Sequence, residues 1–409
     1  MRLLGKRLGD LGNILETRAR NWVTEHVPRN RSRYRARGVV TPGNRESMNS
    51  DGAFTPVFDE VTLAPTPREI YDKSSDFMRL DEYVDTESAA RFHSVAGAWR
   101  VPEGRIYTNQ PSCYYVLDRD NRILTDISYR YQDALDRVPE EELRLTAKYF
   151  PEPERIGGAA ANLVLGGGPA INIYHWMIDA LPRLRLIEEI RPLSEIDAFL
   201  VQGTDSGFRL RSLELLGIDP ARVRFFDRQL IHIQADELLS GSAPRGRVNI
   251  VTPRWAIRFL RERYLKAIEP SQSEWPDKIY ISRRDSSLRG VENEEEVIAQ
   301  LEERGYREIL LSQYSFDDKI ALFHNAREIV AMNGAGLGFL LFCQPDSRLL
   351  ELHPAGYINY AMSNLATQVG MEYRYLIIGE ADTGKSGYDA QRQSLVVDPG
   401  ALKEKMQGW

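Results

Sequence analysis

Cysteine and long apolar runs are both scarce in this sequence. Cys113 and Cys343 are the only cysteines among 409 residues, so we expect neither a disulfide framework nor a cysteine zinc site. A run of about eighteen apolar residues, which a membrane-spanning helix needs, is absent, and the first residues lack the apolar core of a signal peptide. These absences predict a cytoplasmic protein.

Metal-binding patterns are also missing. The six histidines are scattered and none has a zinc-type spacing. No Asp-x-Asp pair follows a predicted strand in the way that a metal-dependent nucleotide-sugar site requires. Asp317 and Asp318 lie at a predicted helix start, where acidic side chains offset the helix dipole. We therefore expect no metal site.

Acidic residues are scarce only at the N-terminus. Residues 1–50 carry eleven Lys or Arg and four Asp or Glu, so their net charge is 11 − 4 = +7 and the remainder carries −6 − 7 = −13. A net charge of −6 argues against a general nucleic-acid binder. In residues 1–37 an apolar stripe of leucines lies beside arginines, which is typical of peripheral contact with an anionic membrane. The same spacing suits a helix docked on the protein body or on a second subunit, so a homo-oligomer stays open.

The chain divides into four regions by composition. Residues 44–67 are polar and rich in turn residues, which predicts a linker, and residues 112–126 predict a β-hairpin. Strand and helix patterns then alternate in two series. The expected regions are a basic extension with linker over 1–55, an α/β domain with the hairpin over 56–268, a second α/β domain over 269–380, and a tail with a short helix over 381–409.

Both series predict parallel sheets that are covered by helices on both faces. In the first series we expect strands at 162–165, 197–201 and 223–226 and helices at 174–190, 208–216 and 253–268. In the second we expect strands at 278–282, 309–311, 328–332, 348–352 and 373–378 and helices at 293–304, 316–326 and 359–369.

The centre of the second series is residues 328–338, an apolar strand that runs into a glycine-rich turn. Gly334, Gly336 and Gly338 would let an anionic group reach backbone N–H donors at a helix start. Glu351, near the end of the next strand, would suit sugar hydroxyls. The alternative is a turn that only packs a helix closely on the sheet.

Two further groups could carry chemistry. His175 and Asp179 are four residues apart on a predicted helix and share a face, as a general-base pair would; the alternative is a backbone-bonded His and a capping Asp. Arg283, Arg284 and Arg289 follow a predicted strand at the sheet edge where α/β folds bind ligands. The planar guanidinium suits a diphosphate, although a solvated basic loop balanced by nearby glutamates would show the same pattern.

Four blocks in order resemble the pattern of family 61 glycosyltransferases, over about residues 160–355. They are His175-Trp176-x-x-Asp179-x-Leu181-Pro182-Arg183; Ser282-Arg283 with Arg289 and Asn293-Glu294; Gly334-Ala335-Gly336-Leu337; and the trailing Phe342, Glu351 and Pro354. The family includes bacterial members that are assigned to capsule or exopolysaccharide synthesis. One position departs from its pattern, because Asn333 stands where the family usually has His.

The resemblance implies a GT-B fold, with two Rossmann-like domains facing across a cleft. The domain over 56–268 would hold the acceptor and the domain over 269–380 the nucleotide sugar. Transfer would be inverting and metal-independent, with no cofactor besides the nucleotide-sugar co-substrate. The implied catalytic residues are Asp179 and His175. The implied donor-binding residues are Arg283, Arg289, Asn333, Gly334, Ala335, Gly336 and Glu351, with Glu351 at the ribose.

The function implied is that of a hexosyl- or pentosyltransferase in bacterial surface polysaccharide synthesis. Its partners would be a nucleotide-sugar donor and a glycan or lipid-linked glycan acceptor, reached at the inner face of the membrane. Two alternatives remain. An NAD-dependent oxidoreductase fits the glycine turn and Glu351, although its third glycine would fall at the bulky Phe339. A non-catalytic nucleotide-sugar-binding protein fits Asn333, which cannot carry a charge.

Overall fold

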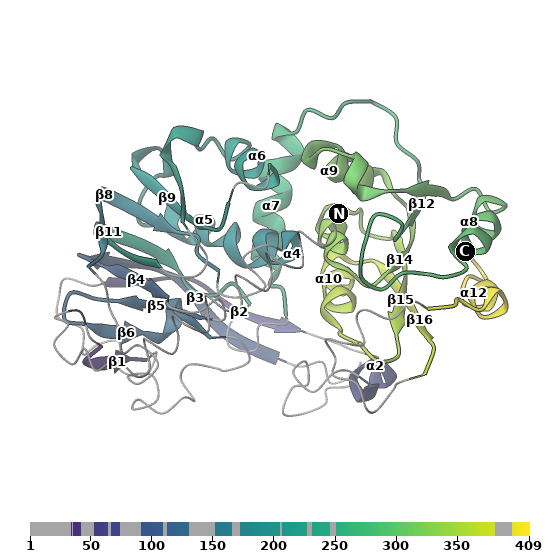
Figure 1. Ribbon diagram of the computed structural model, residues 1–409, viewed down its shortest axis with the longest axis horizontal. Coiled ribbons are helices and arrows are strands. Elements are labelled where there is room, and N and C mark those ends of the chain that lie inside the picture. Colours follow the sequence, from purple (N-terminus) through teal and green to yellow (C-terminus); the bar gives the residue numbers. More distant parts are fainter. Residues whose placement is uncertain are drawn as a thin grey trace, which may run out of the picture. The chain divides into compact units, whose positions relative to one another are not determined.

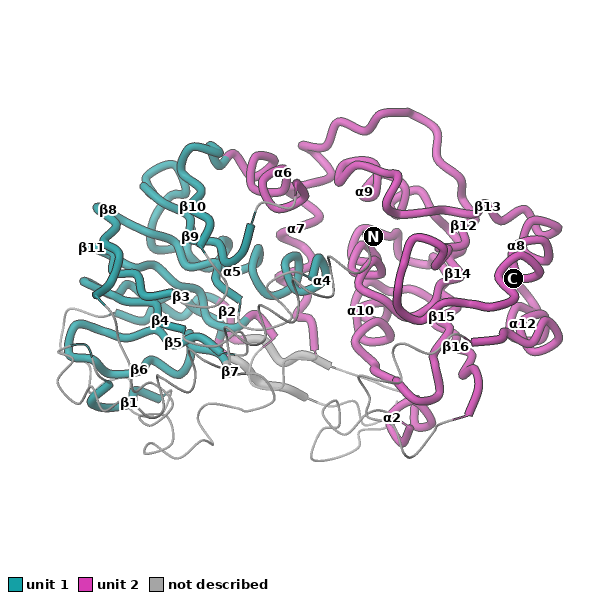
Figure 2. The backbone as a smooth tube through the Cα atoms, viewed as in Figure 1, with its two compact units in different colours: residues 1–57, 96–206, 218–243 teal, residues 58–95, 207–217, 244–409 magenta. Residues whose placement is uncertain are grey.

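The computed structural model describes residues 34, 36–41, 53–63, 67–73, 91–108, 113–130, 152–165, 172–204, 207–226, 231–245, 251–380 and 395–409. Close contacts divide the chain into two compact units (Figure 2). Unit 1 comprises residues 1–57, 96–206 and 218–243, and unit 2 comprises residues 58–95, 207–217 and 244–409. The domain ranges and the GT-B arrangement stay predictions.

Unit 1 is built on a mixed sheet (Figure 1). Its strands among the described residues are β1 Gly38–Val40, β2 Ala53–Leu63, β3 Arg91–Pro102, β4 Arg105–Thr108, β5 Cys113–Leu117, β6 Arg122–Leu124, β7 Tyr129–Arg130, β8 Glu154–Asn162, β9 Ala198–Gln202, β10 Val223–Phe226 and β11 Ile231–Gly241. The main order is β1-β6-β5-β4-β11-β8-β9-β10, and the division between the units falls within β2 and β3.

The parallel sheet predicted for this region is only partly found. Strands β11, β8, β9 and β10 are parallel neighbours, whereas β11, β4, β5 and β6 pair antiparallel in succession. Only four residues separate β4 from β5 and β5 from β6, and connections this short can only produce antiparallel neighbours. The predicted hairpin is confirmed by the pairing of β5 with β6. The strand expected at 162–165 is wrong, since β8 ends at Asn162.

The linker expected over 44–67 is also wrong in part. Residues Ala53–Leu63 form β2, which pairs with β3. This strand contains Pro56, and a proline is tolerated where a strand has a neighbour on one side only. Phe54 packs on Trp99, with ring centroids 5.4 Å apart, so β2 contributes to the core of unit 1.

The segment expected as one helix over 174–190 is divided into three. A short helix α4 (Ile173–His175) leads into a π-helical turn over Trp176–Ala180, and α5 (Pro182–Glu188) follows. The wide turn is closed by Leu181 N–H, which donates to Trp176 O at 3.0 Å. Pro182 has no N–H to donate and its ring would clash with the carbonyl four residues earlier, so the helix widens just before it.

Unit 2 contains the five-stranded parallel sheet that the second series predicts. Its strands are β12 Lys278–Ile281, β13 Arg307–Ile309, β14 Glu328–Met332, β15 Arg348–Pro354 and β16 Glu372–Ile378, in the order β13-β12-β14-β15-β16. The unit's α-helices among the described residues are α2 Arg68–Lys73, α6 Phe208–Glu214, α7 Arg254–Ala267, α8 Glu294–Glu302, α9 Phe316–Asn325, α10 Ala361–Val369 and α12 Pro399–Lys405.

The predicted cover on both faces of this sheet is confirmed. Helices α9 and α10 lie on one face, while α8 and α12 lie on the other (Figure 1). Two details differ from the sequence prediction. The strand expected at 309–311 lies at 307–309, and the segment after the glycine turn, Ala335–Phe342, is a 3-10 helix rather than an α-helix.

The described residues include no helix with the length and apolar character that crossing a membrane requires. Within the same residues, no group of three or more His, Cys, Asp or Glu side chains could hold a metal ion. The predicted membrane contact falls mainly on residues 1–33, which lie outside the described part. Ala36 is buried beside Tyr115 in a small apolar cluster of unit 1.

Candidate active site

The strand order of unit 2 creates a ligand-binding position at one edge of its sheet. From β12 the chain crosses to β13 on one side, then returns past β12 to β14 on the other. In open parallel sheets ligands bind beyond the carboxyl ends of the strands where the order reverses in this way. Here that position lies between the ends of β12 and β14, so residues 282–289 and 333–336 flank it.

Arg283 follows β12 and is held in place from three directions. Its backbone N–H donates to Glu294 Oε1 at 2.8 Å. Its Nη2 donates to Ser286 Oγ at 2.5 Å and to Leu288 O at 2.6 Å, while its buried Nε has no hydrogen-bond partner in the described residues. The guanidinium therefore rests on neutral oxygens and keeps donor capacity for an anion.

Arg289 reaches the same edge by an unusual backbone conformation. Its φ is +55°, in the left-handed region that non-glycine residues rarely adopt. The residue is 9% exposed and its guanidinium lies 5.4 Å from the centre of the Tyr357 ring. Strained residues of this kind persist where the surroundings hold them, and they concentrate at functional sites.

The two arginines influence each other electrostatically. Burial, and then the positive charge of Arg289, lower the pKa of Arg283 to about 10. Burial also lowers the pKa of Arg289, while Tyr357 and Glu351 oppose that change. Both guanidinium groups stay protonated at neutral pH, and a bound diphosphate would relieve the unfavourable burial and proximity of the two charges.

The glycine turn lies directly against Arg283. A Cβ atom on Gly334 would be 2.9 Å from Arg283 Nη1, and one on Gly336 would be 2.5 Å from Leu311 Cδ1. Gly334 has extended backbone and its φ of −179° requires no glycine. Both close contacts are therefore with side chains from the loops after β12 and β13, and the one at Gly334 brings a guanidinium onto the turn. Ala335 and Gly336 are the partly exposed residues there.

Asn333 and Glu351 form a buried network beneath the turn. Asn333 Nδ2 donates to Glu351 Oε1 at 2.6 Å and its Oδ1 accepts from Asn359 Nδ2 at 3.1 Å. The other carboxylate oxygen, Oε2, accepts from the Tyr373 hydroxyl at 2.9 Å and lies 3.2 Å from His353 Nε2. Glu351 is fully buried. Its contact with a ribose stays a prediction. Both carboxylate oxygens of Glu351 already have hydrogen-bond partners within unit 2.

His175 and Asp179 lie together in unit 1. His175 Nδ1 is 2.6 Å from Asp179 Oδ2, so the predicted sharing of a helix face is confirmed. The His175 side chain is 26% exposed and that of Asp179 is 11% exposed. The π-helical turn that contains Asp179 is a rare element that recurs at functional sites. An ionised carboxylate on Nδ1–H leaves the lone pair of the imidazole on Nε2, the tautomer that a general base needs.

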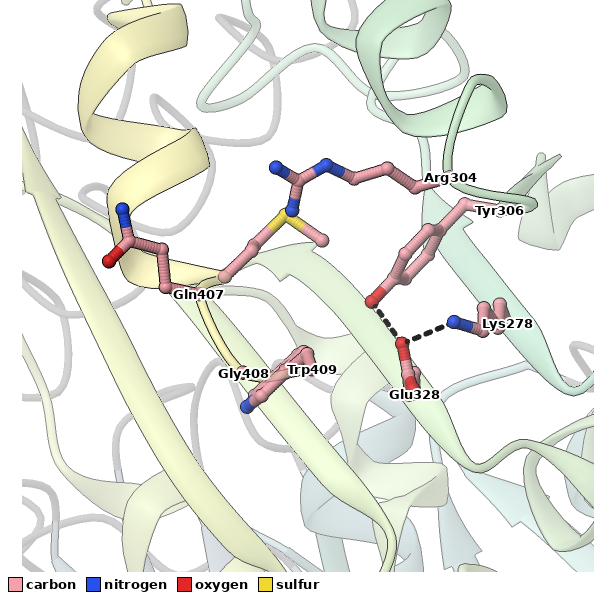
Figure 3. A pocket seen from close by; sticks show the side chains of 8 residues that line it. Lys278, Arg304, Tyr306, Glu328, Gln407, Gly408 and Trp409 are labelled. Atoms are coloured by element: carbon pink, nitrogen blue, oxygen red, sulfur yellow. Dashed lines mark hydrogen bonds and ion pairs between the residues drawn. The ribbon is translucent and has the colours of Figure 1, made fainter.

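A separate cavity of about 290 Å³ lies at the opposite edge of the unit 2 sheet (Figure 3). It is lined by Lys278, Arg304, Tyr306, Glu328, Met406, Gln407, Gly408 and Trp409. Lys278 and Glu328 begin β12 and β14, so the cavity is at the amino ends of the strands. Its Glu328 is already bonded to the Tyr306 hydroxyl at 2.7 Å and to Lys278 Nζ at 3.1 Å. We therefore do not place the anion site in this cavity.

The sequence did not predict several residues of the site at the carboxyl edge of the unit 2 sheet. Tyr357 and Asn359 follow β15, while Tyr373 on the neighbouring β16 and His353 on β15 itself contact Glu351. The strand register places Tyr375 directly opposite Glu351, and Tyr373 reaches the carboxylate from two positions earlier on β16. Register is not visible in one sequence. The polar residues just after β15 were the available signal for Asn359.

Comparison with known proteins finds a similarity in the central part of the chain. Residues 173–350 match the model of the glycosyltransferase 61 family. The matched segment runs from α4 of unit 1 into β15 of unit 2, and it contains both arginines, the glycine turn and the His175–Asp179 pair. It supports glycosyltransferase activity, with a sugar donor and an acceptor as partners. No curated protein matches the chain.

Proposed function

We propose that this protein is an inverting glycosyltransferase that moves a sugar from a nucleotide-sugar donor to a glycan in bacterial surface polysaccharide synthesis. The observation that carries the proposal is the pair of arginines at the switch point of the unit 2 sheet, the half-buried Arg283 and the buried Arg289, inside the segment that matches the glycosyltransferase 61 model. Arg283, Arg289 and the turn at Asn333–Gly336 would bind the donor diphosphate.

The donor side would stabilise the leaving group. When the bond between the anomeric carbon and the diphosphate oxygen breaks, the bonding electrons leave with the nucleoside diphosphate. Two cations that already face this position need no reorganisation to receive the added negative charge. In this proposal Glu351 and Asn333 act by fixing the turn. The donor needs no metal, because the arginines supply the positive charge.

The acceptor side would remove a proton. As an acceptor hydroxyl oxygen bonds to the anomeric carbon, His175 Nε2 takes its proton and becomes imidazolium. Asp179 holds the ring through Nδ1–H and stabilises the imidazolium charge, as the carboxylate of other base–carboxylate pairs does. The observation that supports this order of roles is the greater exposure of His175, 26% against 11%.

Substitution in this pair gives the direct test. We expect His175→Ala to lower kcat by roughly 10²–10⁴-fold, the range for losing a general base, while nucleoside diphosphate affinity stays unchanged. Arg185→Ala is the matched control, because Arg185 forms a pair with Glu189 at the same spacing on α5. Turnover of a nucleotide-sugar panel is the measurement. No turnover and no nucleotide binding by the native protein would exclude the enzyme, and binding without turnover would favour a nucleotide-sugar-binding protein.

We further propose cytoplasmic action on a lipid-linked acceptor, with residues 1–37 as a peripheral contact. Lys and Arg near an anionic membrane contribute roughly 1 kcal/mol each, and salt screens that attraction. Deletion of residues 1–33 should abolish co-sedimentation with anionic vesicles at low salt. If the deleted protein still sediments, the membrane contact is elsewhere or absent.

A further inference from the structure

The segment 395–397 lies beside the loop that carries Arg289. Leu395 bridges to Val291 in parallel fashion. Leu395 N–H donates to Gly290 O at 3.0 Å, and Glu292 N–H donates to Leu395 O at 2.8 Å. Backbone hydrogen bonds therefore fix the residues that directly follow Arg289, from a segment about a hundred positions further along the chain.

Asn293 extends this attachment with its side chain. Its Nδ2 donates to Val397 O at 2.8 Å and its Oδ1 accepts from Val397 N–H at 2.9 Å. Although Asn293 precedes α8, its side chain makes no capping bond to that helix. Val397 and Leu395 are 0% and 8% exposed in the unit 2 core. The amide of Asn293 thus serves the segment 395–397.

Arg289 needs such an attachment more than its neighbours do. A left-handed conformation at a non-glycine residue costs on the order of 1–2 kcal/mol, and it persists only where surrounding contacts impose it. The adjacent Gly290 carbonyl is the one bonded to Leu395. Without that bond, Arg289 could relax to an ordinary conformation and its guanidinium would leave Tyr357.

The other arginine is attached differently. Glu294 Oε1 accepts from Arg283 N–H at 2.8 Å and from the Tyr280 hydroxyl at 2.9 Å. Tyr280 lies in β12, Arg283 in the loop that follows it and Glu294 in α8, and all three lie within the matched residues 173–350. Arg283 is therefore positioned by nearby sequence, and Arg289 by a distant segment outside the matched residues 173–350.

We propose that residues 395–397, which Asn293 holds by two hydrogen bonds to Val397, are a positioning element of the donor site that sets the conformation of Arg289. This inference rests on the proposed function, because it gives Arg289 a diphosphate to bind. Asn293 acts through Arg289 and touches no substrate. Loss of the hydrogen bonds between Asn293 and Val397 should weaken nucleoside diphosphate binding without removing any group that contacts the ligand.

A double-mutant cycle tests the inference. UDP, GDP, CDP and ADP are titrated into the full chain, and the tightest binder is then used with all variants. We expect Asn293→Ala to raise the Kd roughly tenfold, which corresponds to about 1.4 kcal/mol. In an Arg289→Ala background the same Asn293→Ala change should have almost no effect, because the residue it positions is gone.

Gln300→Ala is the matched control. Gln300 Nε2 donates to Pro399 O at 3.0 Å, so it joins α8 to the start of α12, just after the segment 395–397 and at a position further from Arg289 in sequence. This variant should lose a similar amount of thermal stability and change the Kd less than about twofold. Glu296→Ala controls for the 3.0 Å contact of Asn293 with Glu296.

The outcomes separate the inference from the function that it deepens. An unchanged Kd in Asn293→Ala, or an equal loss with and without Arg289, would overturn the inference and leave the donor site standing. A loss in Gln300→Ala as large as that in Asn293→Ala would also overturn it, because general destabilisation would then explain both. If the native protein binds none of the four nucleotides, the proposed function fails and the inference with it.

Discussion

Both edges of the unit 2 sheet carry cations, but the partners of these cations differ. Carboxylates pair with them at the amino edge, whereas neutral oxygens and an aromatic ring contact them at the carboxyl edge. At the amino edge Lys278 lies 3.1 Å from Glu328, and Arg348 lies between Glu328 at 3.5 Å and Glu372 at 3.3 Å. Lys278 and Arg348 thus both have opposite charges from the same sheet edge. These cations stabilise the folded chain, and an added anion would have to displace a carboxylate.

At the carboxyl edge the side chains that surround the arginines are different. Arg283 donates to the hydroxyl of Ser286 and the carbonyl of Leu288, and Arg289 stacks on Tyr357. Burial lowers the pKa of both. Sequence composition alone would not separate the two edges, since both are basic and both have glutamates nearby. The partners of the cations, rather than their number, indicate which edge binds a ligand.

The largest effect should come from changing the arginines at the carboxyl edge. Arg283→Lys or Arg289→Lys keeps the charge but loses the planar, bidentate donor. We expect nucleoside diphosphate binding to weaken by about 1–3 kcal/mol in each variant, with little change in Tm. Arg284→Lys is the control, because Arg284 is exposed and its nearest carboxylates are Glu308 at 3.7 Å and Glu295 at 3.8 Å. Unchanged affinity in both test variants would move the diphosphate elsewhere.

The second largest effect should come from Asp317. This residue lies at the carboxyl edge, but it is ion-paired in the way that the charges of the amino edge are. Asp317, in the first turn of α9, accepts from Arg211 Nε at 2.9 Å and Nη2 at 2.7 Å and from Glu269 N–H at 2.9 Å. Burial alone would raise the pKa of Asp317, but these donors outweigh it and the pKa is lowered. Its stabilisation is therefore present above the ordinary pKa of 3.8 and is lost as the pH falls below it.

We expect Asp317→Asn to reduce the free energy of unfolding by about 2 kcal/mol at pH 7 and to leave nucleotide affinity unchanged. Urea unfolding at pH 7 and at pH 3 measures it, and the difference from the native protein should shrink at the lower pH. Glu214→Gln is the control, since Glu214 is a more exposed partner of the same arginine at 3.6 Å. A difference that grows on acidification would contradict the assignment.

The smallest effect should come from the amino edge. Glu328→Gln keeps the bond from Tyr306 and removes the charge that Lys278 and Arg348 share. We expect a stability loss of about 1 kcal/mol, because the partners Lys278 and Arg348 are themselves about one-third exposed, and no change in nucleotide affinity. Glu372→Gln, whose side chain is 43% exposed, should cost less. A fall in nucleotide affinity in Glu328→Gln would mean that both edges bind anions.

Local sequence signals predicted what local contacts determine. The strands at 223–226 and 328–332 are confirmed as expected, because hydrophobic periodicity acts over a few residues. The predicted helix start at Asp317 and Asp318 is also confirmed, and a capping box of Ser315 and Asp318 fixes it. The pairing of His175 with Asp179 followed from their spacing in the same way. The strand β2 was missed because it depends on pairing with β3, about forty residues away, while residues 44–67 are polar and rich in turn residues.

Non-local contacts of the site could not be predicted. The sequence placed Asn333 and Glu351 near each other, but not their direct bond or the contributions of Asn359 and Tyr373. Each of those depends on strand register and on turns after β15. The left-handed Arg289 was equally hidden, since nothing in an arginine predicts a positive φ.

The end of the matched segment has a practical consequence for anyone expressing parts of this chain. Residue 350 lies inside β15, which pairs with β14 on one side and β16 on the other. A fragment cut there would lose most of β15 and all of β16, and β14 would be left with unpaired backbone beside apolar side chains that the helices no longer cover. Exposed edges of this kind seed aggregation. The segment that matches the glycosyltransferase 61 model is therefore shorter than the folded sheet, and fragments for expression should extend through β16 and the residues that follow it.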